Sequence, residues 1–296
     1  MNKFKGTGVA LVTPFRKEGE VDFNALQKLV EFQIENGVNY LVVQGTTGES
    51  VTLTDEEKVS VLEYIIDVTK NRVPIVLGVG GNNTSNVVQQ IKKFNSYRID
   101  AYLSVSPYYN KPSQAGIVAH YGQIAQVTDK PIILYNVPGR TGSNMTAETT
   151  LTLANTYANI IAVKEASGNL EQIMEIIKNK PSDFLVISGD DALTLPHMAC
   201  GGDGVISVVA NAFPKRFSSM VDYALKGDLE KAKPLHYELF PIIQQLFADG
   251  NPGGIKYVLK LISIGEDHMR LPLVNINDEV AKKLYELVAA IDDTLA

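Results

Sequence analysis

Cysteine and histidine are scarce in this chain of 296 residues, which has one cysteine, Cys200, and four histidines. A single cysteine cannot form a disulfide within the chain, so we expect a reducing, cytoplasmic setting. The histidines all lie away from the ends of the strands predicted below, at His120, His197, His236 and His268. Zinc and iron sites draw heavily on imidazole, so we expect no such metal. The histidine count says nothing against magnesium held by carboxylates.

The chain also lacks an excess of positive charge and long apolar runs. Lys and Arg total 27 against 33 for Asp and Glu, which gives a net charge of -6. Such a chain has no field that attracts nucleic acid or an anionic membrane surface. No apolar stretch approaches the length that spans a bilayer. The N-terminal apolar run covers only residues 9–12, which is too short for the core of a signal peptide.

Short apolar runs rich in β-branched residues recur along the chain, and each is followed by a helical pattern. These runs predict strands at residues 8–12, 40–44, 74–79, 101–105, 131–135, 160–164, 184–188 and 204–208. Most of them lack alternation, as expected when both faces of a parallel sheet are buried. Their spacing matches a closed (β/α)₈ TIM barrel better than a doubly wound sheet, because nothing indicates a smaller cap domain or a reversal of strand order.

The predicted helices carry their own start and stop signals. Asp22 is placed to cap a helix that ends near Gly37, and Thr54 with Glu57 reads as a capping box. Beyond about residue 222 the pattern is wholly helical. We therefore predict a catalytic barrel over residues 1–222 and a C-terminal helical domain over residues 223–296 that packs on it.

Lys164 ends an apolar strand, at the end of a barrel where active sites are built. Burial disfavours the charged form of an amine. A neutral amine can attack a carbonyl, whereas an ammonium cannot. The alternative is a lysine that merely snorkels at the strand end, and position alone favours that alternative.

The residues at neighbouring strand ends shift the balance toward catalysis. A phenol at Tyr135, on the adjacent strand, could pass protons to and from a carbinolamine and an enamine, although a buried core tyrosine is the alternative. Thr46 and Thr47 lie in a glycine-flanked loop that suits a small carboxylate but is more often only a tight turn. Arg140 could bind a carboxylate through two hydrogen bonds, although a solvated arginine is commoner.

Two acidic residues bear on the class of substrate. Asp190 and Asp191 follow the seventh predicted strand, where many barrels bind phosphate. Their negative charge opposes a phosphate group, so a phosphorylated substrate is disfavoured.

Several motifs occur together and in order along the chain. They are Gly45-Thr46-Thr47-Gly48-Glu49, Tyr135-Asn136-Val137-Pro138-Gly139-Arg140-Thr141, Lys164 and Gly204-Val205-Ile206-Ser207-Val208. Together they resemble the pyruvate-dependent class I aldolase superfamily that includes N-acetylneuraminate lyase. Pro107-Tyr108-Tyr109-Asn110 and Arg140 resemble the branch that condenses pyruvate with L-aspartate 4-semialdehyde, which opens the route to diaminopimelate and lysine. The resemblance covers essentially the whole chain.

The resemblance implies a role for each matching residue. Lys164 would form a Schiff base with pyruvate, and Thr47 with nearby amides would hold the pyruvate carboxylate. Tyr135, Thr46 and Tyr109 would relay protons, with Tyr109 reaching in from an adjacent subunit. Arg140 would hold the carboxylate of the semialdehyde, and the carbonyls of Gly189 and Ile206 would shape the pocket. No metal or organic cofactor is implied. The assembly would be at least a dimer and commonly a tetramer.

The resemblance is weaker at a regulatory groove that lysine-inhibited members carry at their dimer interface. The corresponding positions are Ser50, Val51, Asp55, Lys58, Asn82, Asn86 and Tyr108. Ser50, Asn82 and Tyr108 fit. Asn86 replaces a glutamate that would pair with the amino groups of lysine, and Lys58 replaces a histidine. We therefore expect weak or absent inhibition by L-lysine.

One further departure from the family pattern is the segment Asn251-Pro252-Gly253-Gly254, which is usually richer in proline. Because it lies in the helical appendage, we expect it not to touch the site.

Two other functions stay open at this point. A sister aldolase that cleaves N-acetylneuraminate or a 2-keto-3-deoxy sugar acid would need more side chains that bind hydroxyl groups. It would have less need of a cation such as Arg140. A barrel that only binds a keto acid would not require an amine together with a proton relay.

Overall fold

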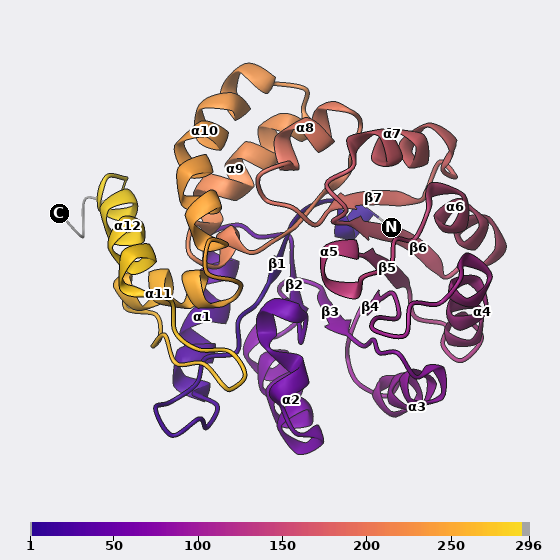
Figure 1. The fold of residues 1–296 in the computed structure, drawn as a ribbon, viewed down its shortest axis with the longest axis horizontal. Helices are drawn as coiled ribbons and strands as arrows, with labels where there is room; N and C mark the ends of the chain where they lie inside the picture. Colours follow the sequence, from indigo (N-terminus) through magenta and orange to yellow (C-terminus); the bar gives the residue numbers. More distant parts are fainter. Residues whose placement is uncertain (1, 292–296) are drawn as a thin grey trace.

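The computed structural model describes residues 2–291, in which eight parallel strands close into a barrel in the order β1 to β8 (Figure 1). The strands are β1 (Gly6–Ala10), β2 (Tyr40–Val43), β3 (Ile75–Gly78), β4 (Ala101–Val105), β5 (Ile132–Asn136), β6 (Ile160–Glu165), β7 (Leu185–Ser188) and β8 (Gly204–Ser207). The predicted (β/α)₈ fold is therefore confirmed. The strand ends differ from the prediction by at most two residues, and the largest shift is in β1.

The strands are buried on both faces, which explains why their sequences do not alternate. All strand residues are buried except Gly78 and Val105, which end β3 and β4. One apolar cluster, which includes Val42, Leu103 and Ile133, fills the barrel interior. A larger cluster lies between the strands and the surrounding helices.

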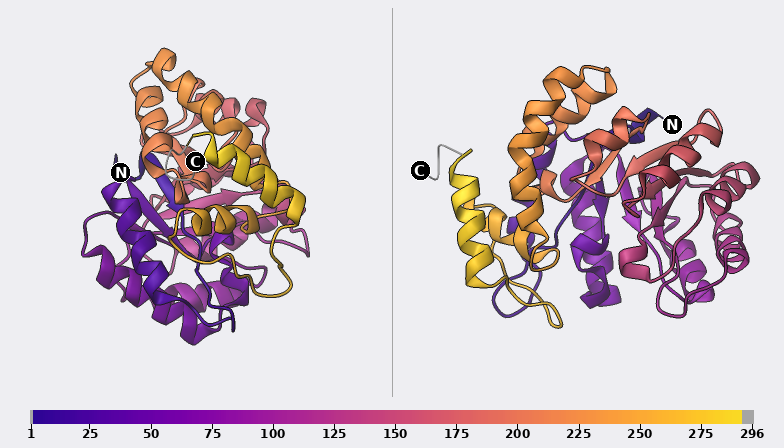
Figure 2. Two further views of the ribbon diagram at one scale, coloured as in Figure 1. Left: turned by 90° about the vertical axis from the view of Figure 1, so that its left-hand side faces the viewer. Right: turned by 45° about the horizontal axis from the view of Figure 1, so that its top comes forward.

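The helices surround the barrel and continue beyond its last strand (Figure 2). They are α1 (Phe23–Glu35), α2 (Asp55–Thr69), α3 (Thr84–Phe94), α4 (Gln114–Ala125), α5 (Pro138–Thr141), α6 (Ala147–Thr156), α7 (Leu170–Asn179), α8 (Thr194–Ala199), α9 (Pro214–Leu225), α10 (Leu229–Leu246), α11 (Gly253–Leu261) and α12 (Asp278–Ala289). Both predicted N-caps are present. The Asp22 carboxylate accepts a hydrogen bond from Ala25 N, and Thr54 with Glu57 forms a reciprocal capping box.

The last three helices form the C-terminal appendage, which lies against one side of the barrel beside α1 and α9 (Figure 1). Its apolar side chains belong to the same cluster that covers the outside of the strands, with Leu239, Ile242 and Val258 among them. Burial in a common core holds the appendage on the barrel. The division at residue 222 stays a prediction, and it falls in the last turn of α9.

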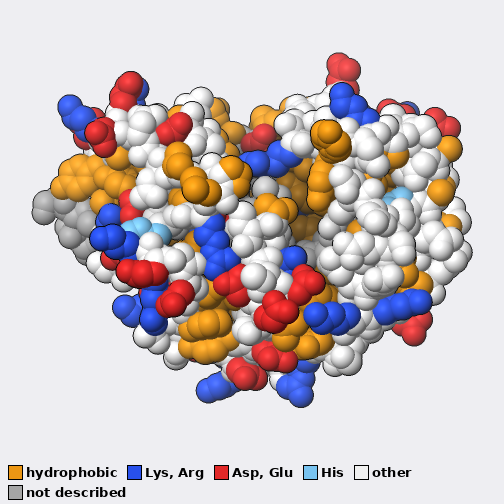
Figure 3. Space-filling view, turned by 60° about the horizontal axis from the view of Figure 1, so that its bottom comes forward, with side chains coloured by type: hydrophobic (Ala, Val, Ile, Leu, Met, Phe, Trp, Pro, Cys, Tyr) orange, Lys and Arg blue, Asp and Glu red, His pale blue; other side chains and the backbone are white. Residues whose placement is uncertain are grey.

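Acidic and basic side chains are interspersed on the molecular face shown in Figure 3. None of the helices within residues 2–291 combines the length and apolar character needed to cross a membrane.

His120 lies buried on α4, and its burial leads us to expect that the folded protein loses stability in acid. Its Nδ1 lies 2.9 Å from Thr84 Oγ1, and burial lowers its pKa to about 4 from 6.5. Between these values the unfolded chain binds a proton that the folded chain does not, so stability falls as the pH falls through this window. Lowering the pH from 7 to 5 should cost about 2 kcal/mol at this residue.

Chemical denaturation of the parent and of His120→Gln at both pH values checks this prediction. Between pH 7 and pH 5, the free energy of unfolding of the parent should fall by about that amount more than that of the variant. A difference that stays the same at pH 7 and pH 5 would contradict it.

Candidate active site

A cavity of about 400 Å³ opens at the C-terminal ends of the strands. Side chains from strand ends and from the loops that follow them line it, as expected for a barrel of this kind. Six of the predicted site residues meet there: Thr46, Thr47, Tyr135, Arg140, Lys164 and Gly189. Asp190, Phe247 and Asn251 also line the cavity. The expectation that the segment at Asn251 does not touch the site is therefore wrong.

Lys164 and Tyr135 lie opposite each other on neighbouring strands, and both line this cavity. They are paired in the register of β5 and β6, and each residue is 6% exposed. The Lys164 Nζ atom lies 4.3 Å from the centroid of the Tyr135 ring. An amine and a phenol in this arrangement can act on the same bound carbonyl compound.

Gly189 gives the Lys164 side chain the space that it occupies. A Cβ atom at this position would lie 2.7 Å from the Ala166 Cβ and 3.0 Å from the Lys164 Cε. Both separations are shorter than ordinary carbon contacts. The glycine therefore lets the lysine stem lie directly over the loop that follows β7.

The Thr46–Thr47 turn forms one wall of the cavity. The residues from Thr46 to Gly48 make a 3₁₀ turn after β2, and Glu49 closes it in the left-handed conformation with φ of 51°. Thr47 is buried, and its Oγ1 accepts a hydrogen bond of 3.1 Å from Asn251 Nδ2. The Gly48 carbonyl accepts a hydrogen bond of 2.7 Å from Thr13 Oγ1. Contacts from both ends of the chain therefore hold the turn.

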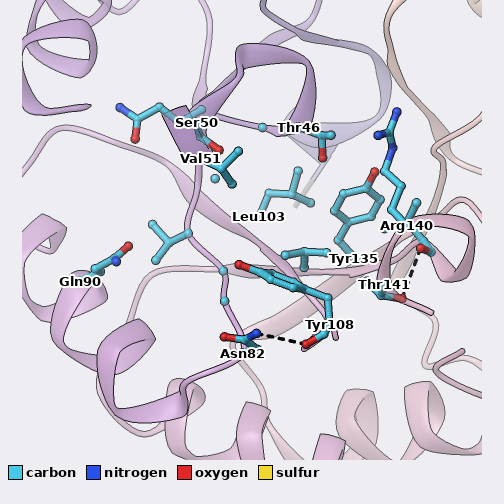
Figure 4. A pocket seen from close by; sticks show the side chains of 18 of the residues that line it. Thr46, Ser50, Val51, Asn82, Gln90, Leu103, Tyr108, Tyr135, Arg140 and Thr141 are labelled. Atoms are coloured by element: carbon cyan, nitrogen blue, oxygen red, sulfur yellow. Dashed lines mark hydrogen bonds between the residues drawn. The ribbon is translucent and has the colours of Figure 1, made fainter. Parts of the chain in front are cut away.

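Arg140 lies in the one-turn helix α5, and its side chain lies beside the Tyr135 ring (Figure 4). Its side chain is exposed at the cavity mouth, where a guanidinium can meet a carboxylate. The Thr46 side chain, on the turn after β2, faces the Tyr135 ring (Figure 4).

Tyr109 does not line the cavity. It is 88% exposed and has a φ of 71°, and its N–H donates to Thr141 O at 3.4 Å. Val51, on the turn that follows Glu49, is also 84% exposed. Large side chains exposed to this extent beside a cavity are typical of surfaces that a partner covers.

Ile206 is 1% exposed within β8 and does not line this cavity. The loop after β8 is instead held by Asp191, whose Oδ2 accepts hydrogen bonds from Val208 N and Val209 N at 3.0 and 2.9 Å. Burial raises the pKa of Asp191 to about 6. The Val208 side of the cavity is therefore shaped by a buried acid, which the sequence pattern did not indicate.

A second cavity of about 540 Å³ adjoins the first and shares Thr46, Tyr135 and Arg140 with it. It reaches the positions of the regulatory groove, with lining residues that include Ser50, Val51, Lys58, Asn82, Asn86 and Tyr108. The Asn82 amide donates to the Tyr108 carbonyl at 3.2 Å (Figure 4). Lys58 forms an ion pair of 3.4 Å with Asp55 on the same helix.

A buried polar network at the ends of β5 and β6 was not predicted from the sequence. Glu165 is 1% exposed and accepts hydrogen bonds from Asn136 Nδ2, Ser167 N and Gln172 Nε2. Asn136 and Glu165 follow Tyr135 and Lys164 in the same register. Adjacent strand residues point to opposite faces, so this network ties the two strands together outside the barrel.

No group of three or more His, Cys, Asp or Glu side chains among residues 2–291 is arranged to hold a metal ion.

Comparisons with known proteins match nearly the whole chain. The model of the Dihydrodipicolinate synthetase family matches residues 3–291. The 4-hydroxy-tetrahydrodipicolinate synthase of Parabacteroides distasonis is 54% identical over 284 residues, which are 96% of this chain and 96% of that protein. The enzyme of the same name from Flavobacterium psychrophilum is 50% identical over 284 residues, with 96% and 97% covered.

Solved structures agree with the sequence relatives. The dihydrodipicolinate synthase of Thermotoga maritima superimposes with a TM-score of 0.96 at 37% identity, and the match covers 99% of this chain and 100% of that chain. The enzyme from Aquifex aeolicus gives a TM-score of 0.94 at 41% identity, with 97% and 98% covered. Because the matches extend through both the barrel and the C-terminal helices, this chain belongs to the dihydrodipicolinate synthetase family.

Proposed function

We propose that this chain is a Schiff-base-forming lyase that condenses pyruvate with L-aspartate 4-semialdehyde. The observation that carries the proposal is the pair of Lys164 and Tyr135: the Lys164 Nζ atom lies 4.3 Å from the centroid of the Tyr135 ring, and both residues line a cavity with Thr47 and Arg140. The relatives named 4-hydroxy-tetrahydrodipicolinate synthase support the same reaction.

The chemistry begins at Lys164. The Lys164 amine adds to the C2 carbonyl of pyruvate, and loss of water from the carbinolamine leaves an imine. Removal of a proton from the pyruvate methyl group converts the imine into an enamine, whose carbon attacks the aldehyde of the second substrate. Tyr135 and Thr46, with Tyr109, form the proposed relay for these proton transfers. No metal or organic cofactor takes part in these steps.

The two carboxylates of the substrates call for two anchors. Thr47 and the amides of its turn suit the small pyruvate carboxylate, because a turn exposes N–H groups at close range. Arg140, at the mouth, suits the carboxylate of the semialdehyde. The Gly189 and Ile206 carbonyls are proposed to shape the pocket. A sugar acid has several hydroxyl groups but no second carboxylate that would need a cation. Arg140 therefore favours the semialdehyde over the substrate of a sister aldolase.

The exposed Tyr109 supports a site completed by a second subunit. In the proposed dimer, the phenol of one subunit enters the cavity of its partner, and two such dimers form a tetramer. A C₂ interface would supply the same contact twice. One solved relative is described as a monomeric dihydrodipicolinate synthase variant, so the size of the assembly is to be measured for this chain.

Trapping with borohydride tests the proposed function directly. Incubation with pyruvate and borohydride should leave a reduced adduct on the peptide that contains Lys164. Pyruvate should then be consumed only when L-aspartate 4-semialdehyde is added. An adduct without turnover of the semialdehyde would point to a sister aldolase, to be assayed by cleavage of N-acetylneuraminate. The absence of an adduct would reject the mechanism.

L-Lysine should inhibit this enzyme weakly or not at all. Asn86 lacks the negative charge that would pair with an amino group of lysine, and the neighbouring Lys58 adds a positive charge to the same cavity. Activity should stay within about twofold of its starting value up to low millimolar L-lysine. In Asn86→Glu, inhibition should become stronger. Strong inhibition of the parent enzyme below one millimolar or so would refute this expectation.

A further inference from the structure

The Thr46–Thr47 turn depends on Glu49, the residue that closes it. Glu49 N donates to Thr46 O at 3.1 Å, and Glu49 O accepts hydrogen bonds from Thr52 N and Thr52 Oγ1. Its left-handed φ of 51° is unusual for a residue other than glycine. The surrounding contacts must therefore hold this conformation in place.

The Glu49 side chain points away from solvent into a contact with the C-terminal appendage. There it forms an ion pair with Lys256 of α11, and the two side chains are 0% and 1% exposed. Lys256 Nζ also donates to His268 O at 2.9 Å and lies 4.2 Å from the centroid of the Phe15 ring. Burying two charges is costly, so such a pair contributes little net stability, whereas removing one partner leaves an unpaired buried charge.

Two further contacts join the appendage to the same turn. Asn251 donates to Thr47 Oγ1, as described above. Arg270 N donates to the Glu49 carboxylate at 3.4 Å, and the Arg270 guanidinium donates to Thr52 O at 2.8 Å. By contrast, the barrel itself contributes the hydrogen bond from Thr13 to Gly48 O. Most of the side-chain restraints on the turn thus come from residues after position 250.

We propose that Lys256 is a positioning residue for the pyruvate site: through its buried ion pair with Glu49, it sets the conformation of the Thr46–Thr47 turn. Lys256 does not line the cavity, so it acts through Glu49 and not by contact with substrate. The helical appendage is thereby part of the machinery that binds pyruvate. This inference rests on the proposed function for its link to pyruvate, whereas the effect on the turn does not depend on it.

Replacing Lys256 by methionine separates positioning from general stability. Lys256→Met should raise the KM for pyruvate roughly ten- to a hundredfold, because a misplaced binding group loses affinity steeply with distance. The kcat at saturating pyruvate should also fall, because Thr46 of the proposed relay lies in the same turn, but by no more than about tenfold, since Lys164 and Tyr135 are untouched. Arg216→Met is the matched control, because it breaks the ion pair from α9 to Glu238 of the appendage, away from the turn. It should leave KM unchanged.

The double variant Glu49→Gln/Lys256→Met guards against misfolding, because it removes both buried charges and leaves neither unpaired. If Lys256 acts through Glu49, the double variant should show the same rise in KM as Lys256→Met or Glu49→Gln alone, and not the product of the two single effects. Lys256→Arg keeps the charge and should restore part of the affinity. A multiplicative effect of the two substitutions would overturn the proposed route through Glu49.

Hydrogen exchange gives a readout that does not involve pyruvate. The amides of residues 46–52 should exchange at least about tenfold faster in Lys256→Met and in the double variant than in the parent, and at the parent rate in Arg216→Met. Unchanged exchange with unchanged KM would refute the positioning role. If the parent traps no pyruvate, the proposed function fails, and the exchange rates still decide whether Lys256 holds the turn.

Discussion

Lys164→Met should reduce the rate of condensation by at least about a thousandfold, because Lys164 is the one lysine among the described residues that line the cavity. Methionine keeps the length of the buried stem that lies over Gly189 but cannot form an imine. The variant should also give no borohydride adduct with pyruvate. Both losses are measured from initial rates of pyruvate consumption and from mass spectrometry of the trapped protein.

The matched control for this substitution is Lys130→Met. Lys130 lies just before β5, at the opposite end of the barrel, where its Nζ donates to Tyr97 O and Ile99 O. The Lys130→Met variant should retain activity and should still form the adduct at Lys164. A Lys164→Met protein that is folded and keeps more than about one hundredth of the parent rate would contradict the covalent mechanism.

The Lys164→Met variant also tests whether Tyr109 contributes to the active site of the neighbouring subunit. Lys164→Met and Tyr109→Phe subunits, each of low activity alone, are dissociated, mixed and reassembled. If the phenol crosses the interface, each mixed dimer has one intact site, and random mixing should restore about a quarter of the parent activity. No recovery in verified mixed dimers would place Tyr109 outside the partner's site.

Tyr135→Phe should lower kcat by roughly a hundred- to ten-thousandfold, which is the range expected for loss of a general acid–base group. Phenylalanine keeps the ring that packs against the Lys164 amine, so the substitution removes only the hydroxyl. Pyruvate should still be trapped on Lys164, but more slowly. Single-turnover trapping rates and steady-state kinetics measure the two effects separately.

Tyr121→Phe is the control for loss of a buried tyrosine hydroxyl. The Tyr121 hydroxyl donates to Ser104 O at 2.8 Å, and the ring lies outside the cavity. Its loss should cost about 1 kcal/mol of stability with little change in kcat. If Tyr135→Phe were no more impaired than Tyr121→Phe, Tyr135 would have a packing role and not a catalytic one.

Local patterns in the sequence determined the barrel and the core of the candidate site. Continuous apolar runs separated by capped helices predict eight buried parallel strands, because burial on both faces removes the need for polar residues. The same argument placed Lys164 and Tyr135 at strand ends. In a parallel barrel those ends converge on one face, so the two residues were expected to lie close together.

Only the tertiary structure decided which distant segments touch the site. Asn251 and Lys256 reach the Thr46–Thr47 turn across some 200 residues of sequence, and no local period or motif records such a contact. Their helical segment predicts a packed appendage, but the direction of each side chain depends on how α11 docks on the barrel. Packing of the whole chain, set by burial of apolar surface in a common core, determines that geometry.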